Sequence, residues 1–206
     1  MVKGAMSPQR TAGQATPGRD SSTRRALIRA TAHVMLEEGY AAATSRRVAA
    51  QAGVKPALVH YYFPTMDDLF IAVLAAGADA NLSTQREAFA EDAPLHALWE
   101  LNSAQGAALW MEFMALANHR KAIGSEIAGY ADRFRELEET AMASALQAHG
   151  VDTDEFPPVV MSMIVASLAR ILVLEQGLGI SRGHAEAQEF VRRYLDRYEL
   201  PEGDPA

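Results

Sequence analysis

The sequence predicts an all-α protein of about nine helices, because apolar residues recur every three or four positions along most of the chain. Glycine and proline separate these periodic stretches, as they do at helix ends. No stretch shows the alternation of apolar and polar residues that is typical of a half-buried strand. The pattern divides into three N-terminal helices, two of them short, and a larger helical body.

The first helix is predicted from about Ser22 to Gly39. Ile28, Ala32 and Met35 recur along it at intervals of four and three, which places them on one face. The hydroxyl of Ser21 or Ser22 can cap the start of the helix, and Gly39 is suited to its end.

The next segment reads TSRRVAAQAGVKPALVHYYF and predicts two short helices. Thr44 carries an N-capping hydroxyl ahead of a helix over residues 45–52. Gly53 stands where the chain must turn sharply, which suits a residue that tolerates positive φ. Pro56 begins a helix over residues 56–62, where a first-turn residue needs no backbone donor. Two short helices about a tight glycine turn are the layout of a helix-turn-helix.

Polar side chains occupy the outward side of this helix pair. They are cations and amide, hydroxyl or imidazole donors, which phosphates and base edges attract. The alternative interpretation is an ordinary helical hairpin with a polar face. The residues are Arg46, Arg47, Gln51, Lys55, His60, Tyr61 and Tyr62.

The body is predicted to begin with a long fourth helix from about Met66 to the low eighties or beyond. Its first turn holds Asp67 and Asp68, whose carboxylates meet the positive end of the helix. Another helix begins at Pro94, and Gly106 separates it from the next. The later helices are predicted over 107–119, 120–149, 157–176 and 183–198.

Composition excludes several classes of protein. The chain of 206 residues has no cysteine, so we expect neither a disulfide framework nor a thiolate metal site. No signal peptide is visible, and the apolar run from Val159 to Ala169 is too short to span a bilayer. We therefore expect a soluble, cytoplasmic protein.

Charge is distributed unevenly along the chain. The net charge of −7 argues by itself against binding to nucleic acid. Residues 1–63, however, hold nine Lys or Arg and three Asp or Glu, a net of +6, whereas residues 64–206 hold a net of −13. Arg19, Arg24, Arg25 and Arg29 extend the basic surface ahead of the helix pair. This distribution indicates that the N-terminal part alone meets a polyanion, although such a run can also be a solvated helix face.

The segment from Thr44 to Phe63 resembles the signature of the TetR family of bacterial transcriptional repressors. The resemblance covers about 50 N-terminal residues closely and the rest in architecture only. It implies that the second short helix enters the major groove of DNA, while the first positions it. The residues that it implies in DNA binding are Thr44, Arg46, Lys55, Pro56, Ala57, His60, Tyr61 and Tyr62, with Arg24 and Arg25 beside them.

The resemblance also assigns roles within this set. Thr44 and Arg46 fall at the start of the positioning helix, where phosphate contact is usual. Tyr62 matches a phosphate-binding tyrosine, and Tyr61 falls at a variable, often base-facing place. Two positions depart from the family: Thr65-Met66 replaces a common Ser-Lys pair, and Arg47 stands where an acidic residue is common.

Four regions follow from the pattern and the resemblance together. Residues 1–20, rich in small and polar types, are predicted to be a disordered arm. A helix-turn-helix DNA-binding domain is predicted over residues 21–65, and a ligand-binding and dimerisation domain over 66–200. Residues 201–206 are predicted to be a frayed tail.

Dimerisation is expected through the helices at about 157–176 and 183–198. The first of them is too apolar to face water on any side, so it needs a partner beyond its own body. A symmetric four-helix bundle with two helices from each subunit supplies one, and the resemblance implies the same arrangement. A monomer whose core absorbs both helices is the alternative. Two heads in one dimer can read a palindromic operator across successive major grooves.

A cavity for a small apolar or amphipathic effector is expected in the body. Bulky aromatic side chains with adaptable methionines suit such a ligand, and the resemblance implies that some cavity exists. The alternative is that these residues fill the core. The candidates are Trp99, Trp110, Met111, Phe113, Met114, His119, Tyr130, Phe134, Met161 and Ile164.

No catalytic or metal site is expected. The six histidines lie far apart and form no HExxH motif, and no catalytic or phosphate-loop motif is present. The glycines at 177, 179 and 183 are explained as a helix connector. We therefore expect a DNA-binding regulator without a cofactor, associated with the nucleoid when bound. The alternatives are a ligand-independent DNA-binding protein, a regulator controlled by a protein partner, and a helical enzyme or lipid carrier.

Overall fold

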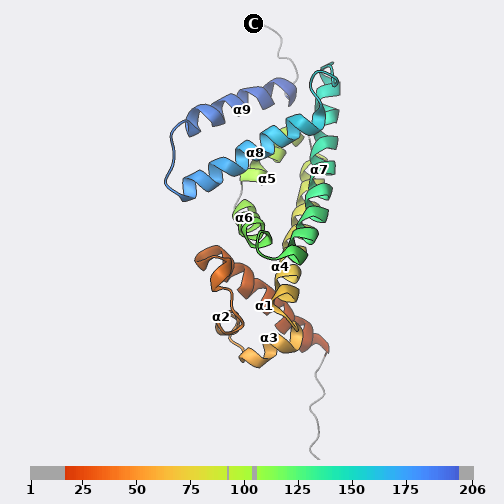
Figure 1. Ribbon diagram of the computed structural model, residues 1–206. Coiled ribbons are helices and arrows are strands. Elements are labelled where there is room, and N and C mark those ends of the chain that lie inside the picture. Colours follow the sequence, from red (N-terminus) through yellow and green to blue (C-terminus); the bar gives the residue numbers. More distant parts are fainter. Residues whose placement is uncertain (1–16, 92, 104–105, 200–206) are drawn as a thin grey trace, which may run out of the picture.

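The computed structural model describes residues 17–91, 93–103 and 106–199, which form nine α-helices, one short 3-10 helix and no strand. The predicted all-α fold class is confirmed. The molecule is elongated, with the first three helices at one end and the last two at the other (Figure 1).

Helix α1 (Pro17–Glu38) begins before the predicted start at Ser22. Residues 17–20, which the sequence pattern places in the arm, therefore form its first turn. Proline is favoured at the first position of a helix because its missing N–H would have no partner there. Residues 1–16 of the predicted arm and the predicted tail over 201–206 lie outside the described residues.

Helices α2 (Ser45–Ala52) and α3 (Pro56–Tyr62) have the predicted bounds. The turn between them depends on Gly53, which has a φ of 66° in the left-handed region. Its N–H donates to the Ala50 carbonyl at 3.2 Å, and the Val54 N–H donates to the Ala49 carbonyl at 3.0 Å. These two bonds satisfy carbonyls at the end of α2 and redirect the chain into α3. A 3-10 helix, η1 (Tyr40–Ala42), which the pattern does not predict, precedes α2.

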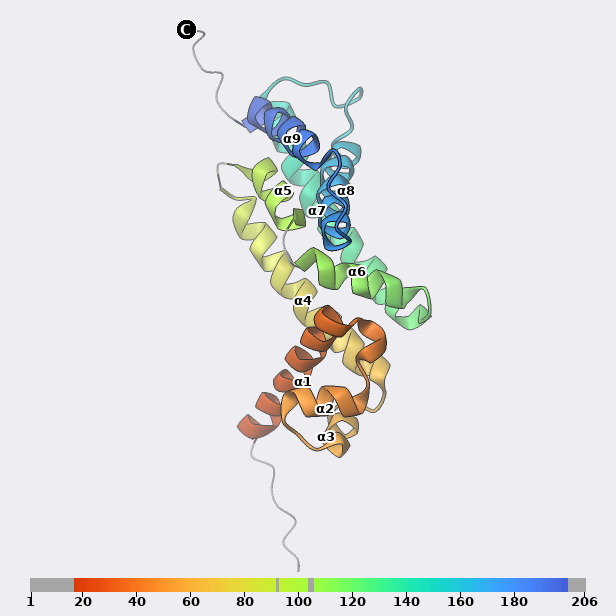
Figure 2. The same cartoon turned by 90° about the vertical axis from the view of Figure 1, so that its left-hand side faces the viewer.

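Helix α4 (Met66–Ala88) joins the N-terminal head to the body. It begins with a capping box: Asp68 N–H donates to the Thr65 hydroxyl at 3.1 Å, and Thr65 N–H donates to the Asp68 carboxylate at 2.9 Å. These bonds satisfy donors that the first turn leaves free. The helix then continues without interruption from the head into the body, so it is suited to transmit movement between them (Figure 2).

The body consists of α4 and five further helices. Helix α7 is the longest, and both α5 and α8 pack against it. Helix α9 packs against α5 and α7. The five helices are α5 (Pro94–Ser103), α6 (Gly106–Ala117), α7 (Lys121–Ala148), α8 (Pro158–Gly177) and α9 (His184–Glu199).

Two apolar cores hold the molecule together. The first is built mainly from the head, but Phe113 of α6 and Ile123 of α7 belong to it as well. The second lies at the other end of the body and unites α5, α7, α8 and α9, with Leu98 and Met142 among its fully buried members. Because the first core crosses from head to body, the two parts cannot move independently without disturbing apolar packing.

The apolar run from Val159 to Ala169, expected to be too short to span a bilayer, is part of a longer helix, α8. By length and composition alone this helix could cross a membrane, and only part of it is buried within the subunit. One face packs on α5 and α7. The opposite face exposes a continuous stripe of large apolar side chains. This stripe consists of Val160, Met163, Ile164, Ile171 and Leu174, and Phe190 of α9 is exposed at the same end of the molecule. Phe190 is one of the apolar residues that recur along α9 at helical spacing, and it is 62% exposed.

Candidate DNA-binding surface and effector cavity

The predicted DNA-binding residues belong to α1, α2 and α3 and to the N-caps of α2 and α3. Helix α3 presents His60 and Tyr61 to solvent, while Val59 anchors the helix in the first core. Tyr61 is 66% exposed, and its ring meets that of Tyr62 edge to face at 5.0 Å. Of the predicted residues, only Tyr62 is half-buried; the exposed ones are Thr44, Arg46, Lys55, Pro56, Ala57, His60, Tyr61, Arg24 and Arg25.

The side chain of Thr44 caps α2 by accepting a hydrogen bond from the Arg47 N–H at 3.3 Å. This bond fixes the start of the positioning helix. Arg24 lies over the ring of Phe63, with its guanidinium carbon 5.0 Å from the ring centroid. Since Phe63 is buried at the end of α3, this contact ties Arg24 to the recognition helix.

Arg47 is occupied within the head. Its Nε donates to Glu38 at 2.9 Å, and its Nη1 donates to Gln51 at 3.2 Å. The hydrogen bond from Arg47 lowers the pKa of the Glu38 carboxyl. The departure from the family pattern at Arg47 is therefore explained by a bond between α1 and α2, and Arg47 is a poor candidate for phosphate contact.

A cavity of about 270 Å³ lies in the body between the two apolar cores. Along α7, Ile127 belongs to the first core, Phe134 and Glu138 line the cavity, and Met142 belongs to the second core. Its size is near the lower end of ligand sites, which occupy roughly 300–1,000 Å³. The other lining residues are Val73, Leu74, Gly77, Ala78, Asn81, Gln85, Leu101, Asn102, Leu109, Trp110, Phe113, Met114, Ile127, Ala131, Arg135 and Arg170.

The cavity contains four of the ten residues suggested by the sequence: Trp110, Phe113, Met114 and Phe134. Trp110 and Phe134 meet edge to face at 5.4 Å between ring centroids. The other six lie elsewhere because helical periodicity does not distinguish a core face from a cavity wall. Trp99 and Met161 pack on the second core, Tyr130 packs on the first, Ile164 and His119 are exposed, and Met111 is half-buried outside the lining.

Three connected polar residues line the cavity, and the sequence pattern does not single them out: Asn102 and Glu138 are buried, and Arg170 is partly buried. Arg170 Nε donates to Asn102 Oδ1 at 2.9 Å, and Asn102 Nδ2 donates to Glu138 Oε1 at 3.1 Å. Arg170 Nη2 lies 3.6 Å from Glu138. The sequence marks these residues only as a single charge on an otherwise apolar helix face. Glu138 lies four residues after Phe134 in α7, and Arg170 lies within α8.

Two polar contacts connect the cavity helices to the head. Glu112 of α6 accepts a hydrogen bond from the Tyr40 N–H at 2.8 Å. Arg120, which precedes α7, pairs with Asp67 in the first turn of α4. A shift of α6 would therefore act directly on η1, and a shift of α7 would act directly on α4.

The buried carboxyl of Glu138 predicts a pH dependence of stability. Burial raises the pKa of Glu138, while the Asn102 hydrogen bond and the charge of Arg170 oppose the rise. Between pH 4.5 and the raised pKa, the folded state therefore binds more protons than the unfolded state, so this group's contribution to the free energy of unfolding falls as pH rises.

We expect Glu138→Gln to remove that component of the pH dependence. Urea unfolding of both proteins at one protein concentration and at several pH values measures it. The wild type should lose stability relative to the variant as pH rises through this window. A difference between the two proteins that stays constant with pH would exclude the protonation of Glu138 as its source.

The head matches a known family. Residues 27–73 match the family described as bacterial regulatory proteins, tetR family. The HTH-type transcriptional regulator BetI of Rhizobium meliloti (strain 1021) is 27% identical over 128 residues. That alignment covers 57% of this chain and 63% of BetI, so the chain matches less than two thirds of the length of this relative.

Solved structures share the fold over most of the chain. A TetR transcription regulator from Haloarcula marismortui is 20% identical, with a TM-score of 0.67 over 87% of this chain and 97% of that one. A candidate transcriptional regulator from Saccharomonospora viridis, solved in complex with choline, is 19% identical, with a TM-score of 0.73 over 85% and 96%. The helix-turn-helix and the matched residues lead to one conclusion: residues 27–73 form a DNA-binding head of the TetR family, on a chain that shares its architecture with these solved structures.

Proposed function

We propose that this regulator is a homodimeric repressor that binds a palindromic operator and leaves it when a small amphipathic ligand enters the body. The observation that carries the proposal is the position of α3. The apolar side chain of Val59 is buried in the head, while Lys55, His60 and Tyr61 are exposed along the outer side of the helix. Such a helix offers cations and hydrogen-bond donors to the major groove and the flanking phosphates.

Dimerisation is supported by the exposed stripe on α8. Four-helix bundles between subunits cover stripes of this kind by repeating the same face around a two-fold axis. Since α3 lies at the end of the subunit away from α8 and α9, a pair joined at these helices can extend two heads toward DNA (Figure 2). Two heads that are spaced roughly 34–36 Å apart would read half-sites on successive turns.

Control by a ligand is supported by the cavity and by what its walls touch. Val73, Leu74, Phe113 and Ile127 line the cavity and also belong to the first core, which extends into the head. The choline complex of the Saccharomonospora viridis protein supports an effector site in a body of this fold. For release, the ligand must bind the DNA-free conformation more tightly than the DNA-bound one. A cytoplasmic location, at the nucleoid when DNA is bound, accords with this function.

Substitutions at the two adjacent tyrosines of α3 test the proposed contacts. Tyr62→Phe removes a hydroxyl assigned to phosphate, so we expect the affinity for operator and for random DNA to fall by the same factor, about tenfold. Tyr61→Ala removes a side chain assigned to base edges, so we expect it to change the ratio of the two affinities. Fluorescence anisotropy with both duplexes at one salt concentration measures these effects.

The duplex selected by the wild-type protein from a random pool serves as the operator. Arg133→Ala is the control, with no expected effect, because Arg133 is 49% exposed on α7, outside the head and the helices of the proposed dimer. Equal losses on the two duplexes for both tyrosine variants would contradict the assignment of Tyr61 to base recognition. A parallel salt titration should show a steep fall in affinity for the wild type, because phosphate contacts release counterions.

A further inference from the structure

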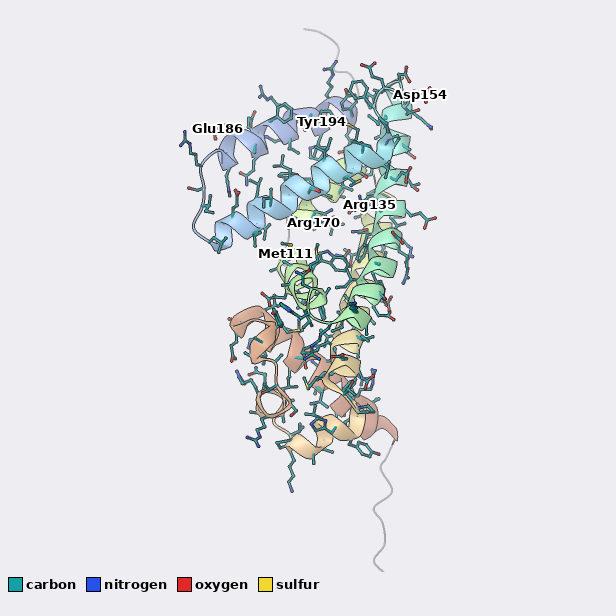
Figure 3. The ribbon with its side chains drawn as sticks, in the orientation of Figure 1. Met111, Arg135, Asp154, Arg170, Glu186 and Tyr194 are labelled. Carbon is teal, nitrogen blue, oxygen red and sulfur yellow. The ribbon has the colours of Figure 1, made fainter. Side chains whose placement is uncertain are left out.

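The charged groups of the cavity carry a surplus of positive charge. The charged residues that line it are two arginines, Arg135 and Arg170, and one glutamate, Glu138. Arginine remains protonated in proteins, so the cavity is positive whether the Glu138 carboxyl is ionised or not. Figure 3 labels Arg135 on α7 and Arg170 on α8 at neighbouring positions above α6.

Glu138 neutralises only one of the two arginines. Arg170 is held by Asn102 at 2.9 Å and faces Glu138 at 3.6 Å. Arg135 is close enough for its charge to act on both Glu138 and Arg170. Yet none of the ion pairs found among the described residues includes Arg135. A half-buried guanidinium beside a like charge is stabilised by an anion.

A second polar group in the cavity lacks a partner. Gln85 of α4 is 4% exposed, and its side-chain oxygen is buried without a hydrogen bond among the described residues. Such a group costs free energy until a donor satisfies it. Apart from Asn81 and Asn102, the remaining lining residues are apolar or aromatic, and Trp110 and Phe134 pack edge to face.

We propose that the effector is a small organic acid whose apolar body, aromatic or aliphatic, fills the cavity and whose carboxylate binds at Arg135 and Arg170. A hydroxyl on that body would donate to Gln85. This inference rests on the proposed control by a ligand and names the chemical class of that ligand. It separates this chain from the choline-bound relative, because a quaternary ammonium ion would meet a cavity of its own sign.

Matched probes test the charge and the hydroxyl separately. Phloretate joins a phenol to a carboxylate through a two-carbon chain; hydrocinnamate lacks the hydroxyl, and tyrosol replaces the carboxylate by an alcohol. Tyramine and choline supply cations. Isothermal titration of the full chain should give phloretate an affinity at least about tenfold above that of tyrosol, and tyramine and choline should not bind.

Variants assign these preferences to residues. Arg135→Gln should lower the affinity for phloretate by about tenfold and leave that for tyrosol unchanged. The hydroxyl of phloretate should give it a higher affinity than hydrocinnamate, and Gln85→Leu should remove that preference. Arg133→Gln is the control, since Arg133 lies on the same helix, is 49% exposed and pairs with Asp79 outside the cavity lining.

The outcomes distinguish this inference from the proposed function. Binding of choline or tyramine in preference to the acids would overturn the acid class and leave control by a ligand standing. Equal affinity of phloretate and tyrosol, or an Arg135→Gln variant that binds phloretate as the wild type does, would also overturn it. If none of the five probes binds, the acid class is rejected, and the repressor function is judged by DNA selection without ligand.

Discussion

Replacing Ile164 by aspartate should convert the protein to a monomer and lower its affinity for the operator by at least 100-fold. Ile164 is 54% exposed on the outer stripe of α8, so the change leaves the subunit core intact. In the proposed dimer, each carboxylate would be buried against an apolar partner face without a counter-charge, which is strongly unfavourable. Losing one head removes the roughly 10²–10⁴-fold gain that two linked sites provide.

Sedimentation at micromolar concentration measures the assembly, and fluorescence anisotropy measures the affinity. Leu36→Asp makes the same chemical change at a residue of α1 that is 40% exposed and belongs to the head, not to the helices of the proposed dimer, so it should remain dimeric. If the wild type and Ile164→Asp both sedimented as dimers, the dimer interface would not be the exposed stripe of α8.

Truncating Phe63 to alanine should destabilise the protein by about 3–5 kcal/mol, the usual cost of removing a buried aromatic ring. Phe63 is 2% exposed and packs in the first core at the end of α3. The same ring supports Arg24, whose guanidinium lies 5.0 Å from its centroid. Because this core continues into the body through Phe113, the loss should reach beyond the head.

Urea unfolding followed by circular dichroism, at one protein concentration, measures this change. Phe156→Ala is the control, since Phe156 is 41% exposed ahead of α8 and its truncation should change the free energy of unfolding by roughly 0.5 kcal/mol or less. An unchanged unfolding midpoint in Phe63→Ala would show that the first core does not carry the stability assigned to it.

The head was predictable from sequence because local chemistry determines it. Thr44, Gly53 and Pro56 each have one strongly preferred role at a helix end, and together they place the bounds of α2 and α3 correctly. The capping residues Thr65 and Asp68 do the same for the start of α4. These signals act within a few residues, so no knowledge of the tertiary structure is needed to interpret them.

The cavity was only partly predictable, because its walls come from helices far apart in the sequence. Apolar periodicity singles out Trp110 and Phe134 but equally singles out Trp99, which packs in the second core. Glu138 and Arg170 become a pair only when α7 and α8 pack together. The exposure of Phe190 has the same origin, since periodicity gives the apolar face of α9 but not how much of it a neighbour covers.

Selection of duplex DNA from a random pool by the purified full chain tests whether two α3 helices bind DNA as a symmetric pair. We expect enrichment of a palindrome whose half-site centres lie roughly 10–10.5 base pairs, or a multiple of that, apart. We also expect the footprints of the two α3 helices to lie on one side of the duplex. Enrichment of no sequence, or of a single unrepeated half-site by a protein that sediments as a monomer, would contradict binding by such a pair.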